Sequence, residues 1–179
     1  TNTSSEPSQG IGPSLVATGF AGDIDWPSDL EATNQDTHRM LSMTDKRVIV
    51  TGASRGIGRA IATQLGAEGA HVICTATREG GCDETAAAIR TDGGSAEAMA
   101  LDIGDEESVR AFAEAVLAGG PPNALVNNAG VTCDGSFLRM TAGDFDRVIN
   151  INLRGTFLVC KAFVRAMTKA KDPRIVNVG

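Results

Sequence analysis

The sequence predicts an α/β fold, a doubly wound parallel sheet with helices on both faces. From Lys46 onward, short apolar runs alternate with longer segments of helical periodicity, the order that produces such a sheet. The first apolar run leads directly into a glycine-rich turn. With 179 residues, 42% of them hydrophobic and 21% charged, the chain can bury one core, so we expect one domain.

Five short apolar runs are predicted as strands, and their length suits strands that are buried on both faces. They span residues 47–51, 71–75, 97–102, 124–127 and 174–178. Helices are predicted over residues 56–69, 83–91 and 105–117. Gly69, Gly93 and Gly119 mark the ends of these helices, because glycine readily takes the backbone conformation that stops one.

The last predicted helix is long and runs from residue 142 to about residue 169. Its apolar residues recur mostly at steps of three and four, which gives one stripe. The stripe consists of Phe145, Val148, Ile149, Leu153, Phe157, Cys160, Val164 and Met167. Asn152 stands in the middle of this helix, where asparagine is disfavoured because its side chain competes with the helix backbone for hydrogen bonds. We therefore expect a partner that compensates for its presence.

Residues 1–42 differ in composition from the rest of the chain. They are rich in serine, threonine, glycine and proline, show no sustained period, and carry six carboxylates against the single basic residue Arg39. We predict a polar, acidic, disordered tail over residues 1–42 and a nucleotide-binding domain over residues 43–179. The alternative is that residues 11–16 and 20–26 dock on the body as an ordered appendage.

The charge and the cysteine pattern exclude several classes of function. A formal net charge of −6 gives no basic field for attracting nucleic acid or an anionic membrane. No apolar stretch reaches the roughly 18 residues of a membrane helix, and no secretory signal opens the chain. We therefore expect a cytoplasmic protein without nucleic-acid or membrane partners. The four cysteines form no C-x-x-C pair, so we expect reduced structural thiols and no metal site.

The glycine-rich turn lies between the first strand and the first helix. It comprises Thr51, Gly52, Ala53, Ser54, Arg55, Gly56, Ile57 and Gly58. Gly52 allows a tight turn, Gly56 lets the backbone approach a pyrophosphate, and Gly58 lets the helix pack close to the strand. The N-terminus of the helix presents unpaired N–H groups to an anion. The turn therefore predicts a dinucleotide site in a Rossmann-type fold; the alternative is a tight turn without a ligand.

The spacing of this turn is G-x-x-x-G-x-G, and the sequence T-G-A-S-R-G-I-G-R-A-I-A resembles the classical short-chain dehydrogenase/reductases. Three further motifs extend the resemblance over residues 43–179: L-D-I at 101–103, N-N-A-G at 127–130 and N-I-N-L-R-G-T-F at 150–157. Within that family, T-A-T-R-E, N-A-G-V-T-x-D and F-L-R-M most resemble the bacterial 3-oxoacyl-acyl-carrier-protein reductases. The chain would hold the first five strands of the family's sheet.

The resemblance implies a site for NADPH. No acid stands at the end of the second strand, where a carboxylate would select NADH. Arg55 and Thr77 match positions that hold the 2′-phosphate, and Arg78 adds charge. The alternative is that the Glu79 side chain turns toward the site and binds the ribose. Further cofactor contacts are implied for residues that line the adenine and nicotinamide sides of the family's site. These are Ala53, Ser54 and Ile57 in the turn, Asp102 and Ile103 after the third strand, and Asn128, Ala129 and Gly130 after the fourth.

The resemblance also implies catalytic groups. Asn152 is the catalytic candidate, because in similar enzymes it holds the catalytic lysine and its proton path through a backbone carbonyl and a water. The family's serine is expected just beyond Gly179, with tyrosine and lysine farther on, and the chain contains no tyrosine. We read Lys161 as a solvated or subunit-facing charge, and His38 and His71 as residues without a catalytic role. The chain is thus expected to be a C-terminally truncated fragment that is itself inactive.

The function expected of the full-length protein is NADPH-dependent reduction of a 3-oxoacyl thioester to the 3-hydroxyacyl thioester, as in fatty acid synthesis. By resemblance, that enzyme would be a homotetramer built partly through the long helix. The alternatives are a short-chain dehydrogenase that acts on another alcohol or ketone, and a non-catalytic dinucleotide-binding module. A P-loop nucleotidase is a poor third choice, because no Gly-Lys-Ser/Thr follows the turn.

Overall fold

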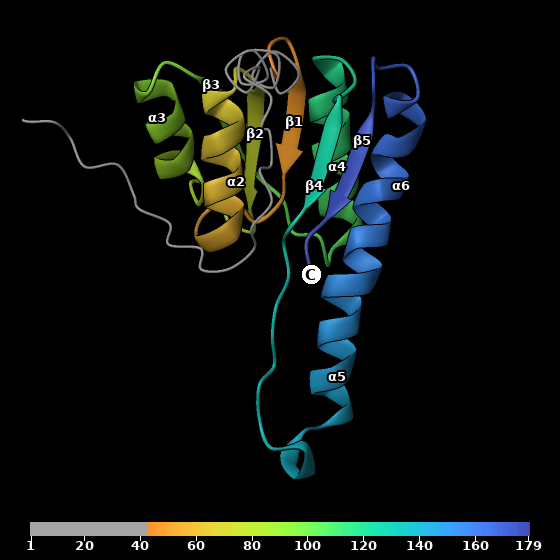
Figure 1. The fold of residues 1–179 in the computed structure, drawn as a ribbon. Coiled ribbons are helices and arrows are strands. Elements are labelled where there is room, and N and C mark those ends of the chain that lie inside the picture. Colours follow the sequence, from red (N-terminus) through yellow and green to blue (C-terminus); the bar gives the residue numbers. More distant parts are fainter. Residues whose placement is uncertain (1–42) are drawn as a thin grey trace, which may run out of the picture.

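The structure is a computed structural model that describes residues 43–179 (Figure 1). The predictions for residues 1–42 lie outside the described residues. Five parallel strands form one sheet in the order β3-β2-β1-β4-β5. The strands are β1 (Arg47–Val50), β2 (His71–Ala76), β3 (Ser95–Ala100), β4 (Ala124–Asn127) and β5 (Arg174–Asn177). The predicted doubly wound parallel sheet is confirmed.

Helices cover the sheet on both faces (Figure 1). Helices α2 (Gly56–Ala67) and α3 (Asp83–Thr91) pack on one face, where Val48, Val50 and Val72 contribute to a buried cluster. Helices α4 (Glu106–Ala118) and α6 (Thr156–Met167) pack on the other face, around Ile49 and Ile73. Neighbouring residues of β1 thus enter opposite cores, which explains why its apolar run is unbroken.

The long helix is continuous but not uniform. It consists of α5 (Ala142–Val148), a π-helical segment η2 (Ile149–Gly155) and α6. Figure 1 shows that α5 projects past the carboxyl ends of the strands, together with the chain that follows β4. That chain carries a short 3₁₀ helix, η1 (Phe137–Arg139). We call residues 131–148 the arm.

The apolar stripe predicted along the long helix does not face the core over most of its length. Phe145, Leu153 and Phe157 are more than half exposed, and Ile149 and Val164 are also exposed. The buried residues of α6 are instead Leu158, Val159, Phe163 and Met167, of which only Met167 belongs to the stripe, and the stripe residue Cys160 packs partly buried against them. The π-helical segment and the overhang of the helix beyond the sheet leave most of this stripe exposed, whereas its residues Cys160 and Met167 pack in the core.

Strand β3 lies two residues earlier than the predicted range 97–102. Ser95 pairs in register with His71, and the side chains of these two residues also bond, with 2.7 Å between Nδ1 and Oγ. At the other end the Asp102 carboxylate accepts a hydrogen bond from the backbone N–H of Gly104 at 2.9 Å, which closes a turn. Asp102 therefore follows the strand rather than ending it.

His71 has partners that its spacing in the sequence does not reveal. Its Nε2 lies 3.2 Å from Oε1 of Glu97, in addition to the contact with Ser95. Both partners lie on β3, which runs beside β2. These bonds join two strands at their amino ends. A structural role therefore explains His71 without any part in catalysis.

Candidate functional site

The glycine turn adopts the conformation that its spacing predicts. Gly52 has a φ of +66°, which only glycine takes without strain. A Cβ on Gly58 would clash with the Gly52 carbonyl oxygen and with the Asn128 side chain, so only glycine fits where α2 meets the turn. Gly56 has a φ of +57°, and a Cβ there would meet nothing within 4 Å. The open space at Gly56 is where a ligand can approach the backbone.

The turn is joined to the end of β4 by two side chains. The buried hydroxyl oxygen of Thr51 accepts hydrogen bonds from the backbone N–H groups of Asn128 and Ala129, both at 3.0 Å. The side-chain amide of Asn128 donates back to the carbonyls of Thr51 at 2.9 Å and Gly52 at 3.1 Å. Asn128 thus fixes the shape of the turn, and its role is wider than the cofactor contact expected of it.

A cavity of about 710 Å³ opens beside this turn at the carboxyl ends of the strands. Ligands of doubly wound sheets bind in this place. Twelve of the thirteen residues expected to contact the cofactor line it: Gly52, Ser54, Arg55, Gly56, Ile57, Gly58, Thr77, Asp102, Ile103, Asn128, Ala129 and Gly130. Ala53 does not line the cavity, since it is fully buried behind the turn.

Sequence reasoning missed five residues that line the cavity: Ala76, Leu101, Val131, Arg147 and Ile151. The first three are direct neighbours of residues that were expected, so widening each motif by one position would have found them. Arg147 and Ile151 are four residues apart and share one face of the long helix. No sequence signal shows that this face meets the loop after β3, where a Cβ on Gly104 would lie 3.3 Å from Ile151.

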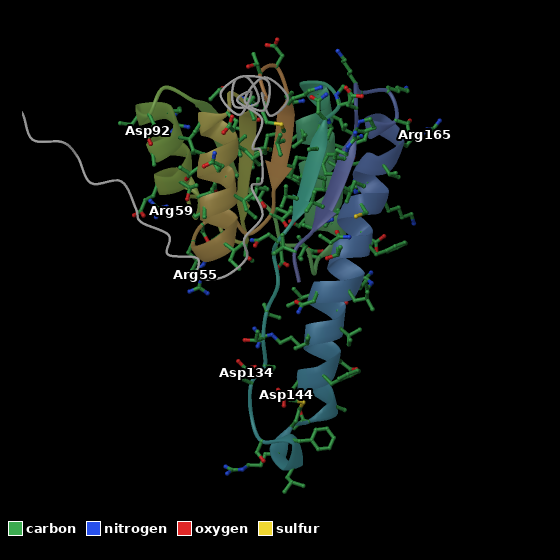
Figure 2. The ribbon with its side chains drawn as sticks, viewed as in Figure 1. Arg55, Arg59, Asp92, Asp134, Asp144 and Arg165 are labelled. Atoms are coloured by element: carbon green, nitrogen blue, oxygen red, sulfur yellow. The ribbon has the colours of Figure 1, made fainter. Side chains whose placement is uncertain are left out.

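The charges around the cavity favour a ligand with negative groups. Asp102 is the one acid among the described residues that line it, whereas Arg55 and Arg147 contribute two cations. Figure 2 shows Arg55 at the start of α2, on the side of the molecule toward which the strands run. Glu79 does not line this cavity. It borders a separate hollow of about 400 Å³ between the start of α3 and β3.

Asp102 and Ile103 reach the cavity from the loop between β3 and α4. The backbone N–H of Asp102 donates to the hydroxyl of Ser108 at 3.0 Å. A Cβ on Gly155 would lie 2.7 Å from the carbonyl oxygen of Ile103, so this glycine allows the long helix to approach the loop. The loop is thereby held between α4 and the π-helical segment.

Asn152 lies in the π-helical segment, and both polar atoms of its side chain have a partner. Its Oδ1 accepts a hydrogen bond from the Val131 N–H at 2.8 Å, and its Nδ2 donates to the Val131 carbonyl at 2.9 Å. Its own carbonyl accepts from the hydroxyl of Thr156 at 2.7 Å. These bonds are the compensation expected for an asparagine inside a helix. Asn152 does not line the cavity, but it holds Val131, which does.

The sequence of residues 46–179 matches the family described as short chain dehydrogenase. The chain belongs to this family. Among curated relatives of this short-chain dehydrogenase, the 3-oxoacyl-[acyl-carrier-protein] reductase of Pseudomonas aeruginosa is 42% identical over 140 residues, which cover 78% of the chain and 57% of the relative. The counterpart in Escherichia coli is 39% identical over 140 residues, covering 78% of the chain and 56% of the relative.

Solved structures of the family have the same fold. A metagenomic short-chain oxidoreductase in complex with NADP superposes with a TM-score of 0.71 at 40% identity, covering 76% of this chain and 62% of that one. A 3-oxoacyl (acyl-carrier-protein) reductase from Agrobacterium tumefaciens with NADP bound gives a TM-score of 0.74 at 29% identity, covering 79% of this chain and 55% of that one. The short-chain dehydrogenase described here spans little more than half the length of the curated 3-oxoacyl reductases it matches.

The remaining reactive side chains lie away from the cavity. Lys161 is exposed, and its Nζ lies 5.7 Å from the centre of the Phe157 ring, which fits a solvated or subunit-facing charge. All four cysteines are free thiols, as the sequence predicts.

Within residues 43–179, none of the helices combines the length and apolar character that crossing a bilayer requires.

Proposed function

We propose that the chain binds NADPH in the cavity and supplies the cofactor half of an enzyme that reduces a carbonyl group. The observation that carries this proposal is the cavity itself. It combines a glycine turn open at Gly56, the N-terminus of α2, and both Arg55 and Thr77 in its lining, without an acid at the end of β2. NADP in two structures of relatives supports the same cofactor.

Each part of the cavity has a role in this proposal. The N–H groups at the start of α2 bind the pyrophosphate, and the φ of Gly56 leaves them accessible. Arg55 and Thr77 bind the 2′-phosphate, with Arg78 adding charge, because the planar guanidinium suits phosphate oxygens. Asp102 and Ile103 hold the adenine. Asn128, Ala129 and Gly130 line the ribose and nicotinamide side.

When bound, NADPH supplies a hydride. The chain's own residues bind and orient the cofactor and exclude water from it. Asn152 is the proposed catalytic-site residue, and it acts by position. Its side chain fixes the backbone at Val131, and its carbonyl, which accepts a hydrogen bond from Thr156, is the group expected to hold the proton path. Protonation of the developing alkoxide needs an acid such as a tyrosine, and this chain has none. We therefore expect no robust carbonyl reduction by these 179 residues alone.

For the substrate we propose a 3-oxoacyl thioester, which is reduced to the 3-hydroxyacyl thioester. The names of the 39–42% identical relatives support this choice. Another alcohol or ketone is the second candidate, because the same nucleotide-binding half serves many substrates. A reductase assay on a longer chain that continues through serine, tyrosine and lysine separates the two. A non-catalytic module is favoured if the natural reading frame stops without them.

For the assembly we propose a homotetramer of the full-length protein, built partly through the long helix. The exposed stripe of Phe145, Ile149, Leu153, Phe157 and Val164 supports it, because apolar faces of this length are usually covered.

Calorimetric titration of the 179-residue chain with NADPH tests the cofactor proposal. Arg55→Ala should weaken NADPH binding by about tenfold or more, since a charge-assisted bond to phosphate is lost. Arg59→Ala is the matched control. Arg59 is an exposed arginine in the first turn of α2 that pairs with Glu84, and it does not line the cavity. Equal affinities for NADPH in the wild type and the Arg55→Ala variant would refute the assignment of Arg55.

A further inference from the structure

Helix α3 is joined to the glycine turn by one buried hydroxyl, that of Thr85. Thr85 Oγ1 donates a hydrogen bond to the carbonyl of Ala53 at 3.0 Å. The N–H of Ala53 donates to the carbonyl of Thr75, near the end of β2, at 2.9 Å. Ala53 and Thr85 have no exposed surface, and Thr75 is 1% exposed. The Ala53 carbonyl thus depends on Thr85 rather than on solvent for its hydrogen bond.

Three successive carbonyls at the start of the turn have protein donors. Asn128 donates to Thr51 and Gly52, and Thr85 donates to Ala53. Of the two donors, Thr85 is fully buried and does not line the cavity, whereas Asn128 lines it. The residues that follow, 54–58, line the cavity as Gly52 does. A carbonyl dipole that faced the cavity would repel an anion there, whereas N–H groups attract it.

We propose that Thr85 is a positioning residue for the pyrophosphate part of the dinucleotide. Its hydroxyl holds the Ala53 carbonyl away from the cavity, so that the N–H groups of the following residues stay directed toward the phosphates. The inference rests on the proposed function, because it needs a dinucleotide in this cavity. Thr85 itself does not line the cavity, so it acts only through Ala53.

Thr85→Val tests this role, because valine has nearly the same shape but no donor. The variant leaves the buried Ala53 carbonyl without a partner, and the unpaired carbonyl regains a hydrogen bond most readily by turning toward the water in the cavity. That turn would place a negative dipole beside the phosphates. Affinity for NADPH should then fall by about fivefold to tenfold.

Two control variants separate this role from a general loss of packing, and a third variant is held as a substitute for Thr85→Val. Thr85→Ser keeps the hydroxyl and should retain wild-type affinity. Thr91→Val removes a hydroxyl from the same helix, where it bonds only the Ala87 carbonyl of its own helix at 2.9 Å, and should also bind as the wild type does. Thr85→Cys, which keeps a weak donor, replaces Thr85→Val in the comparison if the valine variant does not fold.

The titrations use the full 179-residue chain and three probes: NADPH, NADH and adenosine 2′-monophosphate, which lacks the pyrophosphate. Thr85→Val should weaken NADPH and NADH by the same factor and leave adenosine 2′-monophosphate within about twofold of the wild type. A merely structural role would weaken all three probes together, and that result would overturn the proposal.

Two other outcomes would also contradict the proposed role of Thr85. If the wild type binds NADPH and a folded Thr85→Val binds it equally well, Thr85 has no positioning role while the proposed function stands. If the wild type binds neither dinucleotide, the proposed function fails, and the role of Thr85 fails with it.

Discussion

The side-chain amide of Asn152 bonds both backbone groups of Val131, with distances of 2.8 Å to the N–H and 2.9 Å to the carbonyl. An extended segment offers these two groups to a neighbouring strand, and here an asparagine takes the place of that strand. The pair connects the π-helical segment of the long helix to the first residue of the arm, at the edge of the cavity.

Asn152→Ala should remove both bonds and loosen the arm at Val131. Because the side chain is exposed, water replaces part of what is lost, so the free energy of unfolding should fall by only about 1 kcal/mol. Urea unfolding measures this change, and hydrogen exchange at the Val131 amide should accelerate. Asn150→Ala, two residues earlier, is the control. Unchanged exchange at Val131 in Asn152→Ala would show that the pair does not hold the arm.

Gly58→Ala should be strongly destabilising, because the new methyl group would meet the Gly52 carbonyl and the Asn128 side chain. Forcing a methyl group into such a contact typically costs about 1–3 kcal/mol, and the displaced turn should also lose NADPH binding. Thermal unfolding and calorimetry report the two effects. Gly143→Ala, in α5 with its nearest neighbour at 3.7 Å, should be neutral or slightly stabilising. A Gly58→Ala variant with wild-type stability and affinity would contradict the close packing described.

Cys74 and Cys82 should resist thiol reagents in the folded protein. Burial raises the pKa of the Cys74 thiol to about 12 and that of Cys82 to about 11, so few thiolates form near neutral pH. Labelling with a chromogenic disulfide should modify these two thiols only after denaturant is added. Rapid labelling of Cys82 without denaturant, located by mass spectrometry, would show that the start of α3 opens readily.

Cys133 and Asp144 form a hydrogen-bonded pair in the arm. The Cys133 thiol bonds the carboxylate, which raises the pKa of the thiol. Bonds from the Thr141 backbone and hydroxyl, followed by the bond from Cys133, lower the pKa of Asp144. Asp144→Asn should therefore speed alkylation of Cys133 near neutral pH. An unchanged alkylation rate would mean that the pair does not form in solution.

The lowered pKa of Asp144, caused first by its bonds from Thr141 and then by the bond from Cys133, predicts a pH dependence. The pKa of Asp144 is lower in the folded than in the unfolded chain, so its contribution to stability is present above the unfolded pKa of a carboxyl group. It is lost as the pH falls through the folded pKa. The stability difference between the wild type and Asp144→Asn should thus shrink on acidification from about pH 7 to about pH 3. A difference that stays constant over this range would exclude the Asp144 carboxylate as its source.

The fold was largely predictable, because it depends on local patterns. Each strand was recognisable as a short apolar run, and Gly69, Gly93 and Gly119 each lie at or just after a helix end. The glycine turn was predictable for the same reason, since each glycine meets a local steric need. The bounds of strand β3 were predicted two residues too late. A local turn at Asp102 ends the strand early, and its start depends on pairing with His71, which lies in a distant segment.

Features that depend on contacts between distant segments were not predictable. The spacing of the apolar residues correctly predicted a helix. That spacing does not show which of the two apolar faces of the helix packs against the sheet. Thr85 and Ala53 are 32 residues apart, and neither carries a motif that indicates their contact. Asn152 was noticed because asparagine is unusual inside a helix, yet its partner Val131 could be found only from the structure.

The most direct measurement is the ratio of the dissociation constants of NADH and NADPH for the 179-residue chain, obtained by calorimetry under identical conditions. With Arg55 and Thr77 beside the cavity and no acid at the end of β2, NADPH should bind more tightly by about tenfold or more. Tighter binding of NADH would contradict the assigned 2′-phosphate site, and binding of neither would contradict a cofactor site in this chain.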